Sequence, residues 1–165
     1  MASISKYVTK GYGQVEPNHL SAQRNGKIYA QLPADSTLEQ IENGMFVKYD
    51  LAKGKVNLTG EGEWMLVFNE EKTYEANQTR KDFVMTTENQ IRGIIVPRVF
   101  KTDIGDIYTT NMVVDAEYAE EDKLTVDTAT GVLKAAGEAT EFIWQIAKLT
   151  TMPDGQKAVK LVRIA

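Results

Sequence analysis

The sequence predicts a mainly β fold, a sandwich or barrel of short antiparallel strands. The last third of the chain contains three strand-like runs separated by glycine turns, at residues 124–133, 142–149 and 158–164. About nine short, turn-bounded strands can be placed along the whole chain, a spacing typical of sandwiches and barrels. Nowhere does an apolar pattern of helical period extend over about 11 residues or more.

An extended N-terminal arm is expected over residues 1–26, followed by one β-rich domain over residues 27–165. Three glycines and a proline interrupt the arm, and its apolar residues follow no regular period. The arm either remains a disordered tail or docks on a partner and becomes ordered there. Its spaced apolar side chains are the candidate partner-binding residues: Ile4, Tyr7, Val8 and Tyr12.

In the first half of the domain, β-branched and aromatic residues bounded by turn residues predict strands. These strands are expected at residues 27–32, 45–50, 55–58 and 63–69. One short helix of one or two turns is expected at residues 36–42. Asp35 or Ser36 can cap its start, and the Asn43-Gly44 pair can end it in the left-handed conformation.

In the second half, the polar residues 73–88 predict a long excursion between two β sections. Residues 92–99 are expected to form an edge strand, because Pro97 cannot donate a backbone hydrogen bond to a neighbour. A further strand is expected over residues 107–114, followed by an acidic loop over residues 116–123.

Residues 46–56 and 124–133 share one pattern, in which a strand precedes Asp-x-x-x-Gly and another strand follows. An internal duplication would explain this similarity. Any β-hairpin with a glycine-containing loop would explain it equally simply.

Composition narrows the classes of partner. The 165 residues include no cysteine, so disulfides, thiolate metal sites and cysteine nucleophiles are excluded. The net charge is −4, and charges of both signs are interspersed, which predicts neither a nucleic-acid nor a membrane partner. The N-terminus lacks the apolar core of a secretory signal, so a soluble protein synthesised in the cytoplasm is expected.

Candidate catalytic or metal-binding groups are few, and no enzymatic activity is expected. His19 is the only histidine, and its place in the arm favours a surface side chain over a catalytic base. The carboxylates of residues 117–122 form either a calcium site or a solvated loop, and they lack the spacing of a calcium-binding loop. Asp103 and Asp106 form either a carboxylate pair for glycoside hydrolysis or part of a turn.

Three segments resemble parts of the capsid decoration or cement proteins of tailed bacteriophages: residues 42–50, 96–111 and 149–161. The resemblance implies a non-enzymatic virion structural protein without cofactor, located on the capsid surface. It implies the major capsid protein as partner, with further copies of the chain as a second partner. The alternative is a tail-associated or carbohydrate-binding β module for host recognition, which requires an exposed row of aromatics with carboxylate or amide partners.

Overall fold

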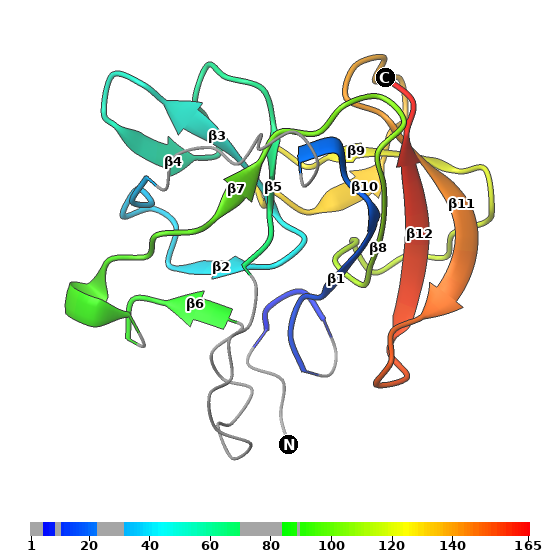
Figure 1. Cartoon of the computed structure of the whole chain (residues 1–165), viewed down its shortest axis with the longest axis horizontal. Coiled ribbons are helices and arrows are strands. Elements are labelled where there is room, and N and C mark those ends of the chain that lie inside the picture. Colours follow the sequence, from blue (N-terminus) through cyan, green and yellow to red (C-terminus); the bar gives the residue numbers. More distant parts are fainter. Residues whose placement is uncertain (1–4, 9–10, 23–31, 70–83, 89) are drawn as a thin grey trace.

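The structure, a computed structural model, describes residues 5–8, 11–22, 32–69, 84–88 and 90–165. These residues form twelve strands, which make a six-stranded sheet, a four-stranded sheet and a two-stranded sheet (Figure 1). All the strand pairs are antiparallel. The prediction of a mainly β sandwich is therefore confirmed, and the sheets do not close into a barrel.

The six-stranded sheet has the order β1-β8-β12-β11-β9-β10. Its strands are β1 (Val15–His19), β8 (Ile107–Thr110), β9 (Lys123–Val126), β10 (Leu133–Ala135), β11 (Trp144–Thr151) and β12 (Lys157–Arg163). The smaller sheets, β4-β3-β5-β7 and β2-β6, contain β2 (Gln40–Glu42), β3 (Phe46–Asp50), β4 (Lys55–Asn57), β5 (Met65–Val67), β6 (Val84–Thr86) and β7 (Val99–Phe100). The hairpins β3–β4, β9–β10 and β11–β12 follow the expected glycine turns.

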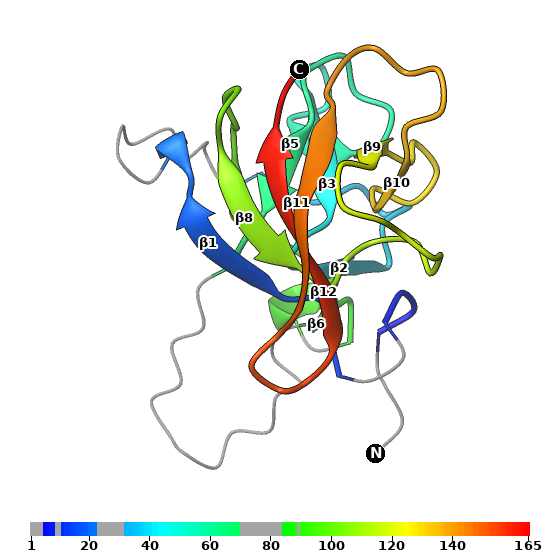
Figure 2. The same cartoon turned by 90° about the vertical axis from the view of Figure 1, so that its right-hand side faces the viewer.

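The longest hairpin, β11–β12, extends well beyond the strand that flanks it. β11 pairs with β12 from Trp144 to Thr151, with one irregularity between Ile146 and Lys148. On its other side, β11 pairs with β9 only through Trp144 and Gln145. Figure 2 shows the two strands separating below this point, so that the far half of β11 stands clear of β9.

Two apolar clusters join the sheets. In one cluster, aromatic rings from both sheets meet: Trp144 lies 4.9 Å from Tyr108 and 6.0 Å from Phe46, measured between ring centroids. The second cluster lies among the smaller sheets and is dominated by methionine, valine and isoleucine side chains. Met112 and Val132 belong to it from the segments beside the large sheet, so both clusters bridge the layers.

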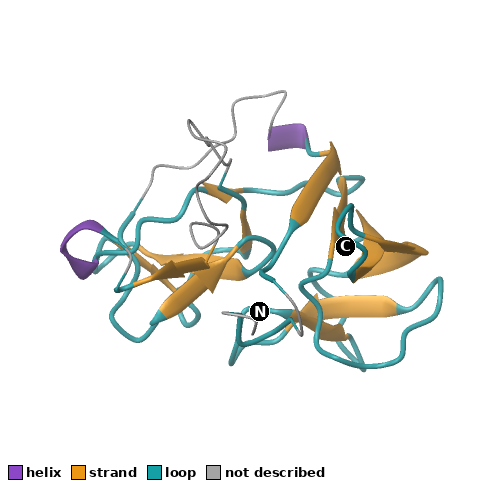
Figure 3. Cartoon of the chain, turned by 90° about the horizontal axis from the view of Figure 1, so that it is seen from below, coloured by secondary structure: helices purple, strands orange, loops and turns teal. Residues whose placement is uncertain are grey.

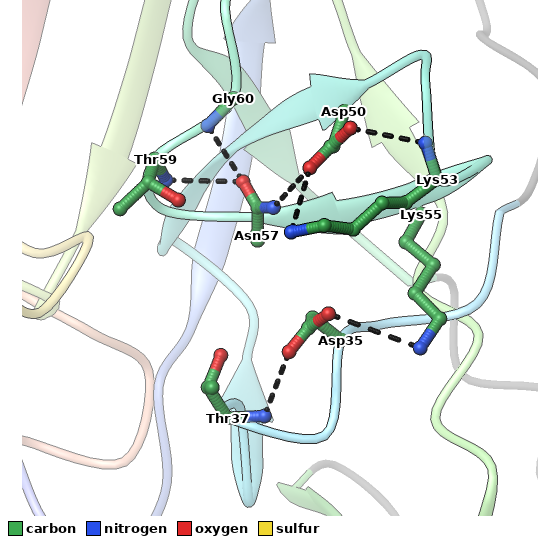
Figure 4. A network of polar contacts seen from close by, with 8 residues as sticks. All are labelled: Asp35, Thr37, Asp50, Lys53, Lys55, Asn57, Thr59 and Gly60. Atoms are coloured by element: carbon green, nitrogen blue, oxygen red, sulfur yellow. Dashed lines mark hydrogen bonds and ion pairs between the residues drawn. The ribbon is translucent and has the colours of Figure 1, made fainter.

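The helix predicted at residues 36–42 is wrong. The Asp35 carboxylate accepts a hydrogen bond from the Thr37 N–H at 3.1 Å, which forms a turn instead of a helix cap (Figure 4). Residues 40–42 are then fully buried as β2 and pair with β6. Gly44, with φ of +92°, forms the turn into β3 and does not end a helix.

Part of the predicted arm belongs to the domain. β1 pairs with β8 at the edge of the large sheet, and Leu20, only 2% exposed, is buried in the aromatic cluster. The predicted boundary at residue 26 therefore does not separate β1 from the domain. Edge pairing uses backbone groups, which the polar side-chain pattern does not reveal. Ile4 and the expected strand at 27–32, except Leu32, lie outside the described residues.

The strand predicted at residues 92–99 is wrong over most of its length. A 3-10 turn, η2 (Ile91–Gly93), is followed by chain that joins a sheet only at Val99. Conversely, β6 lies in the stretch predicted to be an excursion, most of which falls outside the described residues.

Helix is rare in the described part of the chain. It is limited there to η2 and to a turn that includes Ser21 and Ala22 (Figure 3). None of the helices found there is long and apolar enough to cross a membrane.

Candidate functional site

A groove of about 1040 Å³ opens beside the β11–β12 hairpin. Three parts of the chain line it: Tyr7 and Val8 near the N-terminus, residues 113–118 between β8 and β9, and the facing ends of β11 and β12. Its volume lies at the upper limit of small-molecule pockets, which occupy about 300–1,000 Å³. Such an open shape suits an extended ligand.

Asn111 ties these parts together immediately after β8. Its side-chain amide, 6% exposed as a residue, donates to the Tyr12 carbonyl at 3.0 Å and to Gln156 Oε1 at 3.2 Å. Its Oδ1 accepts from the Gln14 N–H at 2.7 Å. One buried amide thus fixes the N-terminal segment against the β11–β12 turn.

The N-terminal wall of the groove is held by Glu42 of β2. This fully buried carboxylate accepts hydrogen bonds from Ser5 Oγ at 2.7 Å and from the Gly13 N–H at 2.7 Å. Gln40 Nε2 donates a third bond at 2.6 Å. Burial raises the pKa of Tyr7, and the nearby Glu42 carboxylate adds to that rise, so the Tyr7 hydroxyl stays neutral at physiological pH.

Another part of the lining, residues 113–118, is supported by β10 and by the Tyr118 side chain. The Val114 N–H donates to the Leu133 carbonyl at 2.8 Å. The Tyr118 hydroxyl donates to the Val114 carbonyl at 2.9 Å, which brings the Tyr118 ring to the groove. Burial raises the pKa of Tyr118, with a further contribution from Asp115.

The charge of the groove is predominantly negative. Three carboxylates line it, those of Asp115, Glu117 and Asp154, against the single ammonium of Lys157. Asp115 and Glu117 are exposed and form neither an ion pair nor a side-chain hydrogen bond within the described residues. Because an unpaired carboxylate attracts cations, the groove favours a ligand that carries positive charge.

Two exposed aliphatic side chains complete the lining. Val114 is 41% exposed and Leu149 is 43% exposed, and they come from two different parts of the lining, residues 113–118 and β11. The groove therefore offers apolar contact, unpaired carboxylates and tyrosine rings together.

The structure brings two of the four predicted partner-binding residues to this groove, Tyr7 and Val8. Tyr12 lies beside it, where its carbonyl accepts from Asn111, but its side chain is not part of the lining. Two further parts of the lining, residues 113–118 and β11, were not among the predicted partner-binding residues. The only sequence signal for the latter was an uncharged run, Leu149 to Met152, at the end of a strand.

The candidate carboxylate pair lies elsewhere and is engaged in the turn before β8. The Asp106 side chain, 1% exposed as a residue, accepts from the Ser21 N–H at 2.8 Å and Ser21 Oγ at 3.0 Å. It also accepts from the Asp103 N–H at 2.9 Å. The carboxylate thus has a structural role in joining the chain after β1 to this turn, as the turn interpretation predicted.

The remaining candidates lie on the surface. His19 is exposed at the end of edge strand β1. In the acidic loop, Asp122 Oδ2 accepts from the Ala119 N–H at 2.8 Å, a local turn contact. Within the described residues, no three acidic or histidine side chains form a group that could hold a metal ion.

Comparison of the chain with protein-family models, with curated proteins and with solved structures gives no match.

Proposed function

We propose that this chain is a non-enzymatic virion structural protein that binds and stabilises or decorates the major capsid protein lattice of a tailed phage. The observation that carries the proposal is that two of the phage-like segments meet at the groove. Residues 96–111 end one residue after β8, and residues 149–161 contain the β11–β12 turn. β8 pairs with β12, and Asn111 of the first segment bonds Gln156 of the second.

A lattice partner suits the open shape of this groove. A capsid presents many identical sites, and contacts that are individually weak gain in effective affinity when one bound molecule touches more than one site. Further copies of the chain on neighbouring sites would supply such additional contacts. The location that follows is the capsid surface.

The test is sedimentation of the purified protein with particles assembled from the major capsid protein of the same genome. The groove variant combines Val114→Asp with Leu149→Asp, which places charge on both apolar walls. Leu51→Asp is the matched control, because Leu51 is 84% exposed at the β3–β4 turn, away from the groove. We expect the groove variant to lose binding and the control to retain it.

Two results would contradict this proposal. Wild-type protein that does not sediment with the particles overturns the capsid function. Equal sedimentation of the wild type and the groove variant shows that another face binds the capsid.

One observation favours the alternative of a carbohydrate-binding module. Tyr7 and Tyr118 both line the groove, together with the carboxylates of Asp115 and Glu117 and the Asn111 amide. That alternative requires an exposed row of aromatics with such partners, and these two partly exposed tyrosines meet the requirement in part. A glycan array separates the two functions: saturable binding that is lost in the Tyr118→Ala variant supports the carbohydrate function.

A further inference from the structure

The outer edge of β11 is unpaired in the described part of the chain. Its other neighbour, β9, pairs only with Trp144 and Gln145. Ile146 pairs instead with the loop before β9. Its N–H donates to the Asp122 carbonyl, and its own carbonyl accepts from the Glu121 N–H. Beyond the irregularity after Ile146, no described strand lies on this side (Figure 2).

The register shows which backbone groups face outward there. In an antiparallel pair, residues alternate between hydrogen-bonded and non-hydrogen-bonded positions. The Met152 N–H donates to the Gln156 carbonyl at 2.8 Å, which makes this a bonded position. Counting back through the pairs of β11 and β12, Leu149 and Thr151 occupy non-bonded positions opposite Val159 and Lys157. Their N–H and C=O groups therefore point away from β12, and both residues line the groove.

The edge strand β1 differs from β11 in this respect. β1 contains Pro17, which has no N–H, and its register is irregular between Pro17 and His19. Proline and irregular register are devices that prevent another strand from pairing with an edge. Residues 149–151 contain no proline or charge, and they line a groove with an exposed leucine. Residues 149–151 thus lack the proline that protects β1, and the irregular register of β11 lies before them, between Ile146 and Lys148.

The chemistry of the groove indicates what kind of strand it accepts. Val114 and Leu149 offer apolar contact, and Asp115 and Glu117 offer negative charge that no ion pair within the described residues neutralises. A strand presents alternate side chains to opposite sides, so one segment can contact the apolar side chains and the carboxylates at once. A second copy of the chain would place the same carboxylates against each other, which like-charge repulsion disfavours.

We propose that the groove binds an extended peptide segment of a partner protein, with apolar residues alternating with lysine or arginine, as an added strand on the outer edge of β11. Backbone hydrogen bonds to Leu149 and Thr151 supply affinity, and the side-chain contacts supply specificity. Identification of that segment as part of a capsid protein rests on the function proposed above. The strand-addition site itself rests on the geometry alone.

The first experiment titrates the isotope-labelled protein with short capped peptides, followed by nuclear magnetic resonance. The binding probe is a peptide of alternating lysine and valine. One comparison peptide has glutamate in place of lysine, and a second carries N-methyl groups on alternate residues, which removes the N–H donors of one edge. We expect shifts at Leu149, Thr151 and residues 113–118, with slower hydrogen exchange at the first two amides.

Each comparison peptide tests one part of the proposal. Loss of two backbone hydrogen bonds should weaken binding about tenfold. The N-methyl groups can lie on the odd or on the even residues of the peptide, which gives two peptides. The one whose methyl groups lie on the edge that pairs with β11 should show this loss. If both N-methylated registers bind as well as the parent peptide, or if the parent peptide shifts no groove amide, strand addition is wrong. If the glutamate peptide binds equally well, the charge preference is wrong.

Protein variants give a second, independent measurement. Leu149→Pro removes the outward N–H, and Leu149→Ala is its control, because it shortens the side chain but keeps that donor. We expect the proline variant to bind the lysine–valine peptide about threefold more weakly than the alanine variant, because one hydrogen bond is lost. Thermal unfolding checks that both variants fold, and if the proline variant does not, the N-methylated peptides decide the question.

The charge contribution has its own matched pair of variants. Asp115→Asn with Glu117→Gln should weaken binding of the lysine–valine peptide. Glu138→Gln with Glu141→Gln, an exposed pair outside the groove, should not. Equal effects of the two double variants would show that the charge contribution is general, and would overturn the role given to the groove carboxylates.

Sedimentation with capsid particles separates the two proposals. If the peptide binds the groove and the wild type does not bind particles, the strand-addition site stands and the capsid function fails. If a folded Leu149→Pro variant binds particles as well as Leu149→Ala does, the capsid does not supply the added strand, although the capsid function stands.

Discussion

The β3–β4 and β9–β10 hairpins have the same turn chemistry. In the first, Asp50 Oδ1 accepts from the Lys53 N–H at 3.1 Å, as Figure 4 shows, and Gly54 has φ of +61°. In the second, Asp127 Oδ2 accepts from Thr130 Oγ1 at 2.8 Å, and Gly131 has φ of +75°. Each turn thus uses an aspartate acceptor and a glycine in the left-handed conformation, which L-residues with a side chain disfavour.

The two hairpins differ in what surrounds the glycine. A Cβ atom added at Gly54 would meet nothing within 4 Å. At Gly131 it would lie 2.5 Å from the Phe46 carbonyl oxygen, because the Phe46 N–H donates to the Gly131 carbonyl at 2.7 Å. The second turn is therefore part of the junction between the sheets. The comparison teaches that local sequence sets the turn, whereas tertiary contact sets how much substitution the turn tolerates.

The largest expected effect is that of Gly131→Ala. The variant combines unfavourable backbone torsion with a clash against rigid backbone, and we expect a loss of about 3 kcal/mol or more in the free energy of unfolding. Gly54→Ala has only the torsional cost, about 1 kcal/mol. Urea unfolding of both variants measures the difference. Equal losses would show that the Phe46 contact does not constrain the turn.

A second substitution sharpens this result. The Cβ added at Gly131 would also lie 3.0 Å from Leu58 Cδ2. Since the nearer obstacle is the Phe46 carbonyl, shortening Leu58 should not restore stability. We expect Leu58→Ala with Gly131→Ala to be no more stable than Gly131→Ala in urea unfolding. A rescue would instead assign the clash to the flexible side chain.

An intermediate effect is expected at the aspartates. The hydrogen bond from Lys134 Nζ, at 2.8 Å, together with that from Thr130, holds the pKa of the Asp127 carboxyl below its ordinary value. For Asp127→Ala we expect a loss of about 1 kcal/mol in the free energy of unfolding at neutral pH. Asp50→Ala should cost less, because the contacts of Asp50 with Lys53 and Asn57 are longer, between 3.1 and 3.2 Å.

The sign of the pH dependence follows from these lowered pKa values. A carboxyl group whose pKa is lower in the folded state contributes stability above its unfolded pKa, about 3.9. That contribution is lost as the pH falls through the folded value. The difference between the wild type and Asp127→Ala should therefore shrink as urea unfolding is repeated from pH 5 downwards. A difference that stays constant would show that the carboxylate charge does not contribute.

The smallest effect is expected at the lysines. Lys134 Nζ lies 2.8 Å from Asp127 Oδ1, but its side chain is 47% exposed, so solvent screens the pair. We expect Lys134→Met to cost less than about 0.5 kcal/mol in urea unfolding, and added salt to reduce that cost further. Lys53→Met, which removes the 3.2 Å contact to Asp50, should have a still smaller effect. A larger cost for Lys53→Met would reverse the order of the two hairpins.

The elements that could be predicted from the sequence are those whose signals are local. The β9–β10 and β11–β12 hairpins contain β-branched strands around glycine turns, and both form as expected. The helix at 36–42 had correct capping residues, but β6 offers pairing partners that bury Gln40 and Glu42, and this tertiary contact overrides the local preference. β1 was missed because an edge strand with a proline leaves almost no periodic pattern.

The candidate site was predictable only in part for the same reason. Tyr7 and Val8 stand out in a polar segment, so the sequence alone made them candidates, and the structure places both in the lining of the groove. Residues 113–118 could not be predicted as part of the groove. The outer side of β11 is open because β9 pairs with only two of its residues, and the residues that line the groove do not reveal this pairing. Asn111 fixes the N-terminal segment against the β11–β12 turn through contacts with Tyr12 and Gln156, which are far from each other in the sequence.

The pairing of β1 with β8 also has a consequence for synthesis of the chain. Gln14 and its partner Asn111 are 97 residues apart, so the N-terminal segment leaves the ribosome long before its acceptor exists. At translation rates of about 5–20 residues per second, it waits roughly 5 to 20 s without its strand neighbour. During that time it is exposed to other nascent chains and chaperones. Pro17 and the polar residues around it make this early strand a poor template for wrong pairing, which a segment that is made first and docks late requires.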